Sequence, residues 1–270
     1  MKKFVFVLLI LFFFDLNTKE QIISLEDSIN NIFRTQLNRE RDIHRNPKKT
    51  LEFFEIDKKK KVLEIAPGRG WYTEIISHYM AETQNFYVTN YSNPSREIIV
   101  KIQKEFHNYF KENKSRFGSF NVVNFDKEMI FDNFKGNYFD LVLTFRNTHN
   151  WLDAQSAENV YESINKIMKI DGILGVVQHR ANEDSKFDFK KGYVKESFLI
   201  KLIESKGFKL VEKSEINSNS KDKKDYPKGV WTLPPRLINK DFNKNEYLSI
   251  GESDRMTLKF LKIRNFSLNN

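Results

Sequence analysis

The fold of this chain is decided at residues 62–71, which read Val62-Leu63-Glu64-Ile65-Ala66-Pro67-Gly68-Arg69-Gly70-Trp71. The first residues are mostly apolar and predict a strand, and a helical pattern at residues 72–80 follows the two glycines. A glycine turn between a strand and a helix lets a ligand approach the backbone beside the helix N-terminus, where free N–H groups point outward. The stretch therefore predicts an α/β fold of the nucleotide-binding type.

The residues around the turn distinguish between the kinds of nucleotide cofactor that such a fold could bind. A dinucleotide-binding turn requires a third glycine three residues after the second, and Thr73 stands at that place. The acid that such sites use to bind the ribose is missing as well, because the next predicted strand leads into Asn90. No Gly-Lys-Ser/Thr sequence follows the glycines, which excludes a P-loop. Glu64 places a carboxylate where a cationic amino group of a ligand could be held.

Outward from the turn, predicted strands and helices alternate along the chain. Strands are predicted at residues 61–66, 85–89, 120–125, 139–145, 172–178, 208–216 and 256–263, and helices at residues 72–80, 95–114, 154–169 and 194–205. This alternation predicts a mostly parallel sheet with helices on both faces. The last strand follows a long loop without a crossover helix, so we expect it to run antiparallel. We interpret residues 61–270 as one domain.

The N-terminus has the pattern of a secretory signal. Lys2 and Lys3 precede an apolar run of 11 residues, Phe4–Phe14, which is too short to span a bilayer comfortably. No small-x-small cleavage site follows, so residues 1–19 are either removed as a signal peptide or kept as an N-terminal anchor that engages the membrane. We expect an exported protein, periplasmic or membrane-tethered, rather than a cytoplasmic one.

Residues 20–60 are interpreted as an N-terminal helical extension. Apolar residues at helical spacing predict a helix at 22–33. A second helix is predicted to begin with Asn46 as its cap and Pro47 at its first position.

The composition narrows the classes of function. The formal net charge is +9, but most of the 45 basic residues are lysines scattered among acids. Recognition of phosphate and bases favours arginine, so nucleic acid is a disfavoured partner. Cysteine is absent, which excludes a disulfide, a thiolate nucleophile and a cysteine-ligated metal. The histidines lack partners at ligand spacing, so no metal site is predicted.

Taken together, the motifs resemble a known family. They are Arg41-Asp42 to Arg45-Asn46-Pro47, Thr50-Leu51-Glu52-Phe53-Phe54, the stretch from Glu64 to Thr73, Asp140-Leu141-Val142-Leu143-Thr144-Phe145-Arg146-Asn147, His149-Asn150-Trp151, the stretch from Gly229 to Arg236, and Ile250-Gly251-Glu252-Ser253-Asp254-Arg255-Met256. Residues 64–70 resemble motif I of class I S-adenosylmethionine-dependent methyltransferases, with Ala66 in place of the first glycine. The whole set is similar to a family of bacterial predicted methyltransferases that carry N-terminal signal peptides.

This resemblance implies a Rossmann-like class I methyltransferase fold. Its seven-stranded sheet has the order 3-2-1-4-5-7-6, with strand 7 antiparallel, which agrees with the ending expected from the residues. The implied cofactor is S-adenosyl-L-methionine, lying across the carboxyl ends of strands 1 to 4. The implied cofactor-binding residues are Glu64, Ala66, Gly68, Gly70, Trp71, Asn90, Tyr91, Phe125, Asp126 and Thr144.

The roles of these residues follow from their positions in the family. Glu64 and the two glycines would hold the methionine part, Asn90 would lie near the ribose, and Phe125 and Asp126 near the adenine. Asn90 departs from the usual acid, and an amide accepts fewer hydrogen bonds from the ribose hydroxyls than a carboxylate does. Neighbouring Tyr91 is expected to compensate.

The candidate reaction centre is the stretch 144–151, which follows a buried strand and should face the same crevice. His149 is a candidate general base, because its ordinary pKa suits proton removal near neutrality; alternatively it only bonds neighbouring backbone. Arg146 either binds an anionic substrate or the cofactor carboxylate, or forms a structural salt bridge. Asn147 either orients the substrate or caps the following turn. Pro234 and Pro235 stiffen a segment that forms a lid or an ordered surface loop.

The sequence thus predicts an S-adenosylmethionine-dependent methyltransferase acting on a small molecule or an envelope component. Two alternatives remain open. One is a non-catalytic ligand-binding protein on the same fold, and the other is a membrane-anchored RNA methyltransferase. The sequence carries no signal for an oligomeric state.

Overall fold

The computed structural model describes residues 22–94, 96–125, 134, 136–186, 188–239 and 242–266. The predicted signal segment at residues 1–19 and the predicted adenine neighbour Asp126 lie outside these residues. Among the residues that are described, no helix is both long and apolar enough to cross a membrane.

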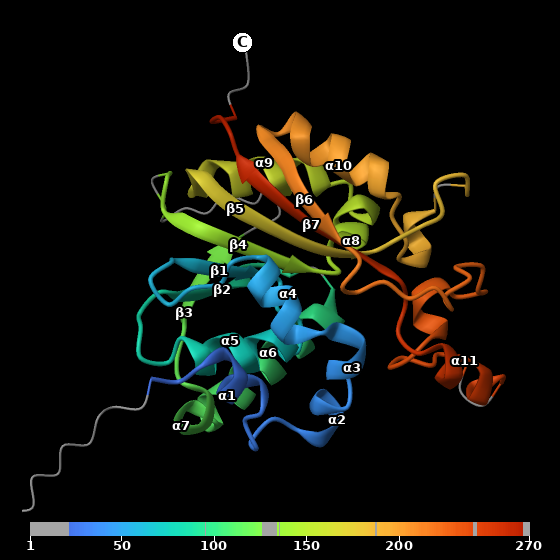
Figure 1. Cartoon of the computed structure of the whole chain (residues 1–270), viewed down its shortest axis with the longest axis horizontal. Coiled ribbons are helices and arrows are strands. Elements are labelled where there is room, and N and C mark those ends of the chain that lie inside the picture. The colour runs from blue at the N-terminus through green and yellow to red at the C-terminus, as the bar shows by residue number, and fades with distance from the viewer. Residues whose placement is uncertain are drawn as a thin grey trace, which may run out of the picture.

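The centre of the molecule is a seven-stranded sheet (Figure 1). Its strands are β1 Val62–Ile65, β2 Phe86–Tyr91, β3 Asn121–Phe125, β4 Phe139–Phe145, β5 Met168–His179, β6 Phe208–Ser214 and β7 Arg255–Lys262. Their order is β3-β2-β1-β4-β5-β7-β6, with β7 antiparallel to both of its neighbours and the other pairs parallel. The predicted Rossmann-like fold, including its antiparallel last strand, is confirmed.

Helices cover both faces of this sheet, as the alternating pattern predicted (Figure 1). On one face α8 Thr148–Asp153, α9 Ala157–Ile167 and α10 Glu196–Ser205 pack over a core that includes Leu63 and Val142. On the other face lie α1 Leu25–Ile29, α4 Pro47–Phe53, α5 Trp71–Tyr79, α6 Glu97–Glu112 and α7 Lys114–Phe117, over a core that includes Leu141. Alternate residues of one strand thus enter different cores, because successive strand side chains point to opposite faces.

The Phe54 ring packs against β5 at Gly175. Gly175 of β5 shows why a glycine is needed inside a buried strand: an added Cβ would lie 2.7 Å from both the Phe54 ring and a methyl group of Leu143. Such a distance is below any normal contact, so the bulk of Phe54 has taken the place of a side chain at Gly175.

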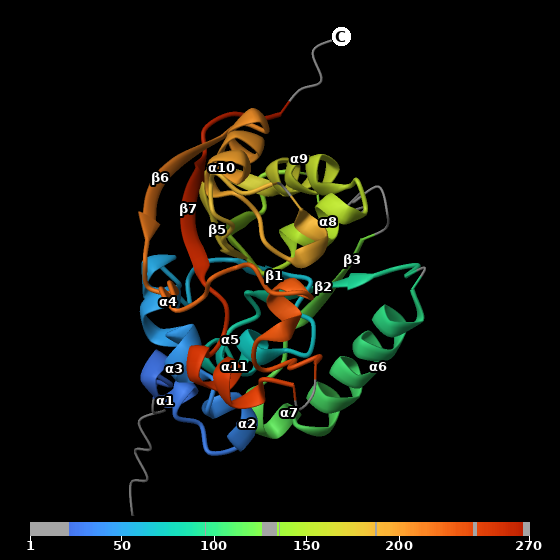
Figure 2. The ribbon, with the colours of Figure 1, turned by 90° about the vertical axis from the view of Figure 1, so that its right-hand side faces the viewer.

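Short helices complete the carboxyl end of the sheet. They are α2 Gln36–Arg39, α3 Asp42–Arg45 and α11 Lys244–Ile250, together with the 3₁₀ turns η1 Phe189–Lys191 and η2 Gly229–Thr232. Figure 2 shows α2, α3 and α11 grouped at one end of the molecule. The end of α11 contacts α3, since a Cβ added at Gly251 would lie 2.7 Å from the His44 ring. The first and last parts of the chain therefore meet beside the glycine turn.

Three local predictions are wrong. The helix predicted at 22–33 ends at Ile29, because the Asn31 side chain accepts a hydrogen bond from the Phe33 N–H and forms a turn there. The helix predicted at 154–169 is Ala157–Ile167, and β5 begins at Met168, before the strand predicted at 172–178. Asn46 precedes α4 as predicted, but its side chain does not cap the helix and instead donates to the Ile216 carbonyl at 2.7 Å.

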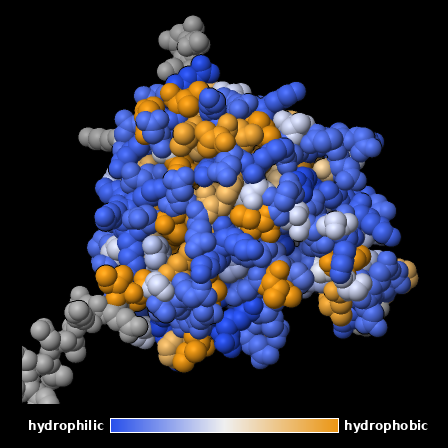
Figure 3. All heavy atoms as spheres, viewed as in Figure 1, coloured by the Kyte–Doolittle hydropathy of each residue, from blue (hydrophilic) through white to orange (hydrophobic). Residues whose placement is uncertain are grey.

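The face of the molecule in Figure 3 is largely hydrophilic, with apolar residues in separate groups. The N-terminal extension exposes several large apolar side chains, among them Ile32, Leu37 and Ile43. Scattered apolar side chains are common on protein surfaces.

Candidate functional site at the carboxyl end of the sheet

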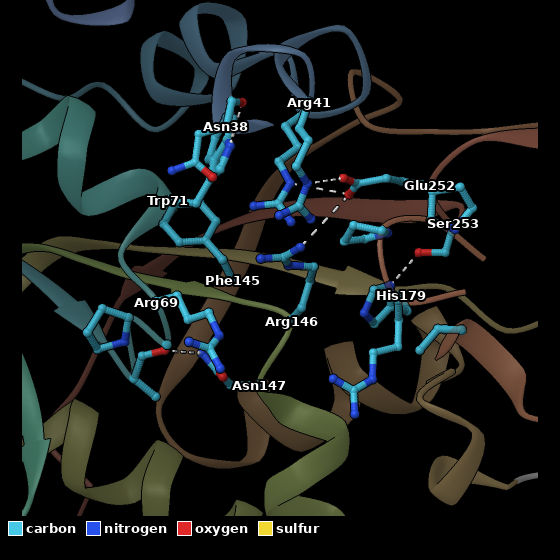
Figure 4. Close-up of a pocket in the computed structure, with 18 of the residues that line it drawn as sticks. Asn38, Arg41, Arg69, Trp71, Phe145, Arg146, Asn147, His179, Glu252 and Ser253 are labelled. Carbon is cyan, nitrogen blue, oxygen red and sulfur yellow. Dashed lines mark hydrogen bonds and ion pairs between the residues drawn. The ribbon is translucent and has the colours of Figure 1, made fainter. Parts of the chain in front are cut away.

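A cavity of about 710 Å³ opens at the carboxyl ends of β1 and β4. Its volume lies within the range of about 300–1,000 Å³ that is usual for small-molecule sites. Its walls come from the glycine turn, from α6, from the residues after β4, from the N-terminal extension, and from the inserts around η2 and Glu252. Figure 4 shows these walls with the side chains that point into the cavity.

The two glycines of the turn have different structural roles. Both have a positive φ, of 62° at Gly68 and 81° at Gly70, as does Ala66 with 50°. A Cβ added at Gly68 would meet nothing within 4 Å, so the backbone there is bare and open to the cavity. A Cβ at Gly70 would fall on the Phe110 ring and lie 3.0 Å from Phe106, so this glycine lets α5 begin against α6.

Asn147 holds the glycine turn in place. Its amide nitrogen donates to the carbonyls of Ile65 and Ala66 at 3.1 and 3.2 Å, and lies 3.2 Å from the Thr144 hydroxyl. The Thr89 hydroxyl accepts a hydrogen bond from the Ala66 N–H at 2.8 Å. Asn147 precedes α8 but makes no side-chain cap to it, so the alternative that it caps the following turn does not hold. Thr144 lies beneath the turn, outside the lining of the cavity.

Glu64 lies underneath the turn rather than in the cavity. It is buried and does not line the cavity, and its carboxylate accepts a hydrogen bond from the Thr73 hydroxyl at 2.6 Å. Burial raises the pKa of Glu64 to about 7, although the bond from Thr73 and the charge of Arg146 act in the opposite direction. Thr73, which takes the place of a third glycine, is therefore the partner of this carboxylate.

Of the predicted ribose and adenine residues, the structure describes Asn90, Tyr91 and Phe125, and it does not bring these three to the cavity. The Asn90 side chain donates to Asn124 Oδ1 at 2.9 Å, and its oxygen lies 2.9 Å from His107 Nε2. The rings of Tyr91 and Phe125 pack against each other with centroids 4.4 Å apart. None of these described residues lines the cavity.

Instead, α6 supplies the wall on this side, which sequence reasoning missed. Arg69 of the turn forms an ion pair with Glu105 of α6. Further along α6, the Tyr109 hydroxyl donates to Glu74 at 2.7 Å, and Asn38 of the extension donates to the other oxygen of Glu74 at 2.9 Å. The sequence predicted a helix at residues 95–114, but nothing in the sequence pairs that helix with the turn.

Trp71 lines the cavity without closing it. Its indole N–H donates to the Asn38 carbonyl at 2.9 Å, which directs the ring toward the N-terminal extension. The guanidinium of Arg45 lies 4.6 Å from the centre of the ring, within the range of a cation–π contact. Trp71 therefore joins the extension to the glycine turn.

Four arginines surround one carboxylate on the opposite side of the cavity. Glu252 lies 2.6 Å from Arg41 Nε, 3.2 Å from Arg45 Nε, 3.3 Å from Arg255 Nη1 and 3.9 Å from Arg146 Nη1. In Figure 4, Arg41 and Arg146 point toward Glu252 from opposite sides. Burial alone would raise the pKa of Glu252, but the four guanidinium groups together hold it well below its usual range. We call these five residues the arginine cluster.

Two roles were left open for Arg146: binding an anionic group of the substrate or cofactor, or forming a structural salt bridge. This residue has a φ of 63° immediately after β4, and its guanidinium lines the cavity. Burial lowers the pKa of Arg146 to about 10, while Glu252 opposes that shift. The distance to Glu252, 3.9 Å, is the longest of the four in the arginine cluster. Glu252 belongs to a stretch that carried the family resemblance, yet nothing in the sequence marked it as the shared partner of four arginines.

His149 lies in the first turn of α8, buried at the edge of the cavity. The Gln178 amide nitrogen donates to the Gly192 carbonyl at 3.0 Å and lies 3.2 Å from His149 Nδ1. Because that amide nitrogen is a donor, Nδ1 is the acceptor and the proton of the neutral ring lies on Nε2. Burial lowers the pKa of His149 to about 4, so the ring is neutral near pH 7.

A second histidine, which the sequence did not single out, lies beside it. The ring centres of His149 and His179 are 5.5 Å apart, and His179 Nδ1 lies 2.5 Å from the Ser253 hydroxyl. Both His179 and Ser253 line the cavity. Within the described ranges, no three histidine or acidic side chains are grouped so that they could hold a metal ion.

Comparisons with known proteins place the fold. No protein-family model matches the chain, and no curated protein matches its sequence. A SAM-dependent methyltransferase from Aquifex aeolicus aligns with a TM-score of 0.56 at 14% identity, over 83% of this chain and 93% of that chain. An S-adenosylmethionine-dependent methyltransferase from Clostridium acetobutylicum aligns with a TM-score of 0.51 at 12% identity, over 83% and 92%.

A third similar structure has a different reaction in its description. The [4+2]-cyclase SpnF aligns with a TM-score of 0.55 at 14% identity, over 82% of this chain and 80% of that chain. The fold is thus shared by proteins described as methyltransferases and by one described as a cyclase, so function has to be argued from the site. The chain has the Rossmann-like fold of class I S-adenosylmethionine-dependent methyltransferases.

Proposed function

We propose that this chain is an S-adenosylmethionine-dependent methyltransferase whose cofactor binds in the cavity at the glycine turn. The observation that carries the proposal is the bare backbone at Gly68, where an added Cβ would meet nothing within 4 Å. A ligand can therefore lie directly on the peptide groups between β1 and α5, at the N-terminus of a helix. When bound, S-adenosylmethionine supplies an activated methyl group on a sulfonium. The fold shared with methyltransferases supports the same cofactor.

Within this proposal, the peptide groups of Ala66 and Gly68 contact the cofactor, and Trp71 bounds its pocket. Gly70 acts indirectly by letting α5 start against α6. Two residues support the turn from below: Glu64 through Thr73, and Thr144 through Asn147. The resemblance implies Asn90, Tyr91, Phe125 and Asp126 as neighbours of the ribose and adenine, but Asn90, Tyr91 and Phe125 do not line the cavity and are not proposed as cofactor contacts.

The proposed acceptor side holds Arg146 and His149. The Nε2–H of the neutral His149 ring is a donor that can fix an acceptor group, and Asn147 fixes the turn opposite. Holding two reactants in line supplies much of the rate of a group transfer, so these residues are proposed to act by orientation. His179, whose ring centre lies 5.5 Å from that of His149, is proposed as a second hydrogen-bonding group for the acceptor.

The acceptor is proposed to be a small molecule or an envelope component, because the N-terminal sequence pattern is that of an exported or membrane-tethered protein. Fractionation of expressing cells tests the location. The protein is expected in the periplasmic or membrane fraction, and its recovery in the cytoplasm alone would contradict this part of the proposal.

The cofactor is tested by calorimetry on the full-length protein with S-adenosylmethionine and S-adenosylhomocysteine. The decisive variant is Gly68→Ala, which adds one methyl group at the open face of the turn. Gly136→Ala is the matched control: its φ is 51°, and the added Cβ would lie 3.3 Å from the Lys166 carbonyl, away from the cavity. Both variants carry a similar backbone strain, roughly 1–2 kcal/mol for a residue with a side chain at positive φ.

The two variants are expected to lose similar stability, while only Gly68→Ala loses affinity for the cofactor, by about tenfold or more. Equal affinities of the two variants would contradict a cofactor lying on Gly68. Absence of binding by the native protein would remove the proposed function altogether. Cofactor binding without transfer of labelled methyl to any small-molecule or envelope fraction would favour the ligand-binding alternative.

A further inference from the structure

The arginine cluster carries more positive charge than its surroundings neutralise. Its four guanidinium groups and the one carboxylate of Glu252 leave a formal excess of three positive charges. Other acids near the cavity have partners of their own. Glu105 pairs with Arg69, and Glu74 lies 3.6 Å from Arg34. The excess charge therefore stays concentrated at the cavity wall.

Arg45 has an unused donor in this wall. Its side chain is 2% exposed, and its Nη1 atom has no hydrogen-bond acceptor among the described residues. Its Nε atom already contacts Glu252, and its Cζ atom lies 4.6 Å from the centre of the Trp71 ring. A buried guanidinium with an unmet donor is costly unless an anion or another acceptor reaches it. Because Arg45 lines the cavity, a ligand in the cavity is placed to supply that acceptor.

The arginine cluster extends from the glycine turn, where Arg45 lies near Trp71, to the start of β7. Arg146 follows β4, while Glu252 and Arg255 lie at the start of β7, beyond β5 in the sheet order. The glycine turn follows β1, and its other wall is α6. The cavity thus has two ends: a bare backbone at the glycine turn and a cationic wall that also includes His179 and Ser253.

We propose that the substrate that accepts the methyl group carries an oxyanion, a carboxylate or a phosphate, which binds Arg41, Arg45 and Arg146 beside Glu252. The inference rests on the proposed function and names its substrate class. Guanidinium groups bind such oxyanions through paired, charge-assisted hydrogen bonds, and Arg45 Nη1 is available for one of them. Glu252 holds the guanidinium groups in a fixed arrangement, so the binding surface exists before the anion arrives.

The methionine part of S-adenosylmethionine also carries a carboxylate, which could bind the same arginines. The experiment must therefore distinguish an oxyanion of the substrate from the carboxylate of the cofactor. Inorganic phosphate is titrated into the full-length protein without cofactor, by calorimetry in a chloride buffer of constant ionic strength, which cancels general screening. S-adenosylmethionine and 5′-methylthioadenosine, which lacks the amino acid part, are titrated separately. The variants are Arg45→Met, Arg41→Met and, as a control, Arg180→Met.

Two arginines are changed separately, so that one variant can still be measured if the other does not fold. Arg41 has a side chain that is 23% exposed, so its loss should leave the fold intact even if Arg45→Met does not fold. Arg180 is also ion-paired, to Asp254, Glu215 and Glu196, but it does not line the cavity. Arg45→Lys keeps the charge and loses the paired geometry, so it should recover part of the phosphate binding.

Native protein is expected to bind phosphate, and Arg45→Met or Arg41→Met to weaken that binding by about tenfold or more, with Arg180→Met unchanged. Their affinity for S-adenosylmethionine is expected to change by less than about threefold. Two results would overturn the inference: no phosphate binding by the native protein, or a loss of S-adenosylmethionine affinity that methylthioadenosine does not share. The second result would assign the arginine cluster to the cofactor carboxylate. If native protein binds phosphate but not S-adenosylmethionine, the methyltransferase proposal fails and the anion site remains.

Discussion

Replacement of Glu64 by Gln tests the burial of a carboxylate beneath the glycine turn. Burial raises the pKa of Glu64 from its ordinary value of 4.5 to about 7. Between these two values the folded protein keeps a proton that the unfolded chain has released, so the unfolding free energy falls as the pH rises. The full loss is reached above pH 7 and amounts to about 3 kcal/mol. A glutamine resembles the protonated side chain and can still accept the hydrogen bond from Thr73.

The measurement is urea unfolding of native protein and Glu64→Gln at about pH 4.5 and about pH 8. We expect similar stabilities at the lower pH, and a variant that is more stable by up to about 3 kcal/mol at the higher pH. The exposed Glu112 of α6, changed to Gln, controls for the loss of one negative charge. If the difference between Glu64→Gln and native protein is the same at both pH values, then Glu64 is not buried as a proton-holding group and the reasoning is refuted.

The same variant distinguishes two roles of Glu64 in ligand binding. A loss of S-adenosylmethionine affinity of about tenfold or more would mean that the carboxylate touches the cofactor, as the family resemblance implies. A change below about threefold would mean that it only supports the turn through Thr73, as its position beneath the cavity favours.

Two further predictions concern a buried histidine and a buried glycine. Burial lowers the pKa of His149 to about 4, so the contribution of its neutral ring to stability is present above pH 6.5 and is lost as the pH falls toward 4. In urea unfolding, His149→Gln should therefore remove up to about 3 kcal/mol of the loss of stability that acid causes. An unchanged pH profile would contradict a buried neutral ring. Gly175→Ala forces a methyl group against Phe54 and Leu143, which should cost about 1–3 kcal/mol and lower the Tm in calorimetry; a native Tm would mean that Phe54 can move aside.

The sheet could be predicted from the sequence because most of its strands are apolar and well separated along the chain. The strand predicted at 139–145 is β4, and the order and direction of the strands follow from the family resemblance together with the missing crossover helix before β7. Short elements were predicted less well. α8 has only six residues, which is fewer than two turns, and its sequence shows no helical period.

The glycine turn could be located from the sequence, but the rest of the cavity could not. Gly68 and Gly70 belong to one short motif, so covalent connection alone keeps them close together. The pairing of Asn147 with the carbonyl of Ala66 joins residues 81 positions apart, and the contact between Arg69 and Glu105 joins residues 36 positions apart. Contacts of this kind depend on how helices pack, which one sequence without its relatives does not specify.

The contact between Arg41 and Glu252 spans 211 positions, and that between Arg45 and Glu252 spans 207. During synthesis on the ribosome, both arginines are therefore made long before the carboxylate that they bind. Because the chain is made from its N-terminal end, the residues of β1 to β5 all exist before Glu252 has been made. Until then the like charges of Arg41, Arg45 and Arg146 lack their shared carboxylate. The arginine wall of the ligand pocket can therefore be completed only after almost the whole chain has been made.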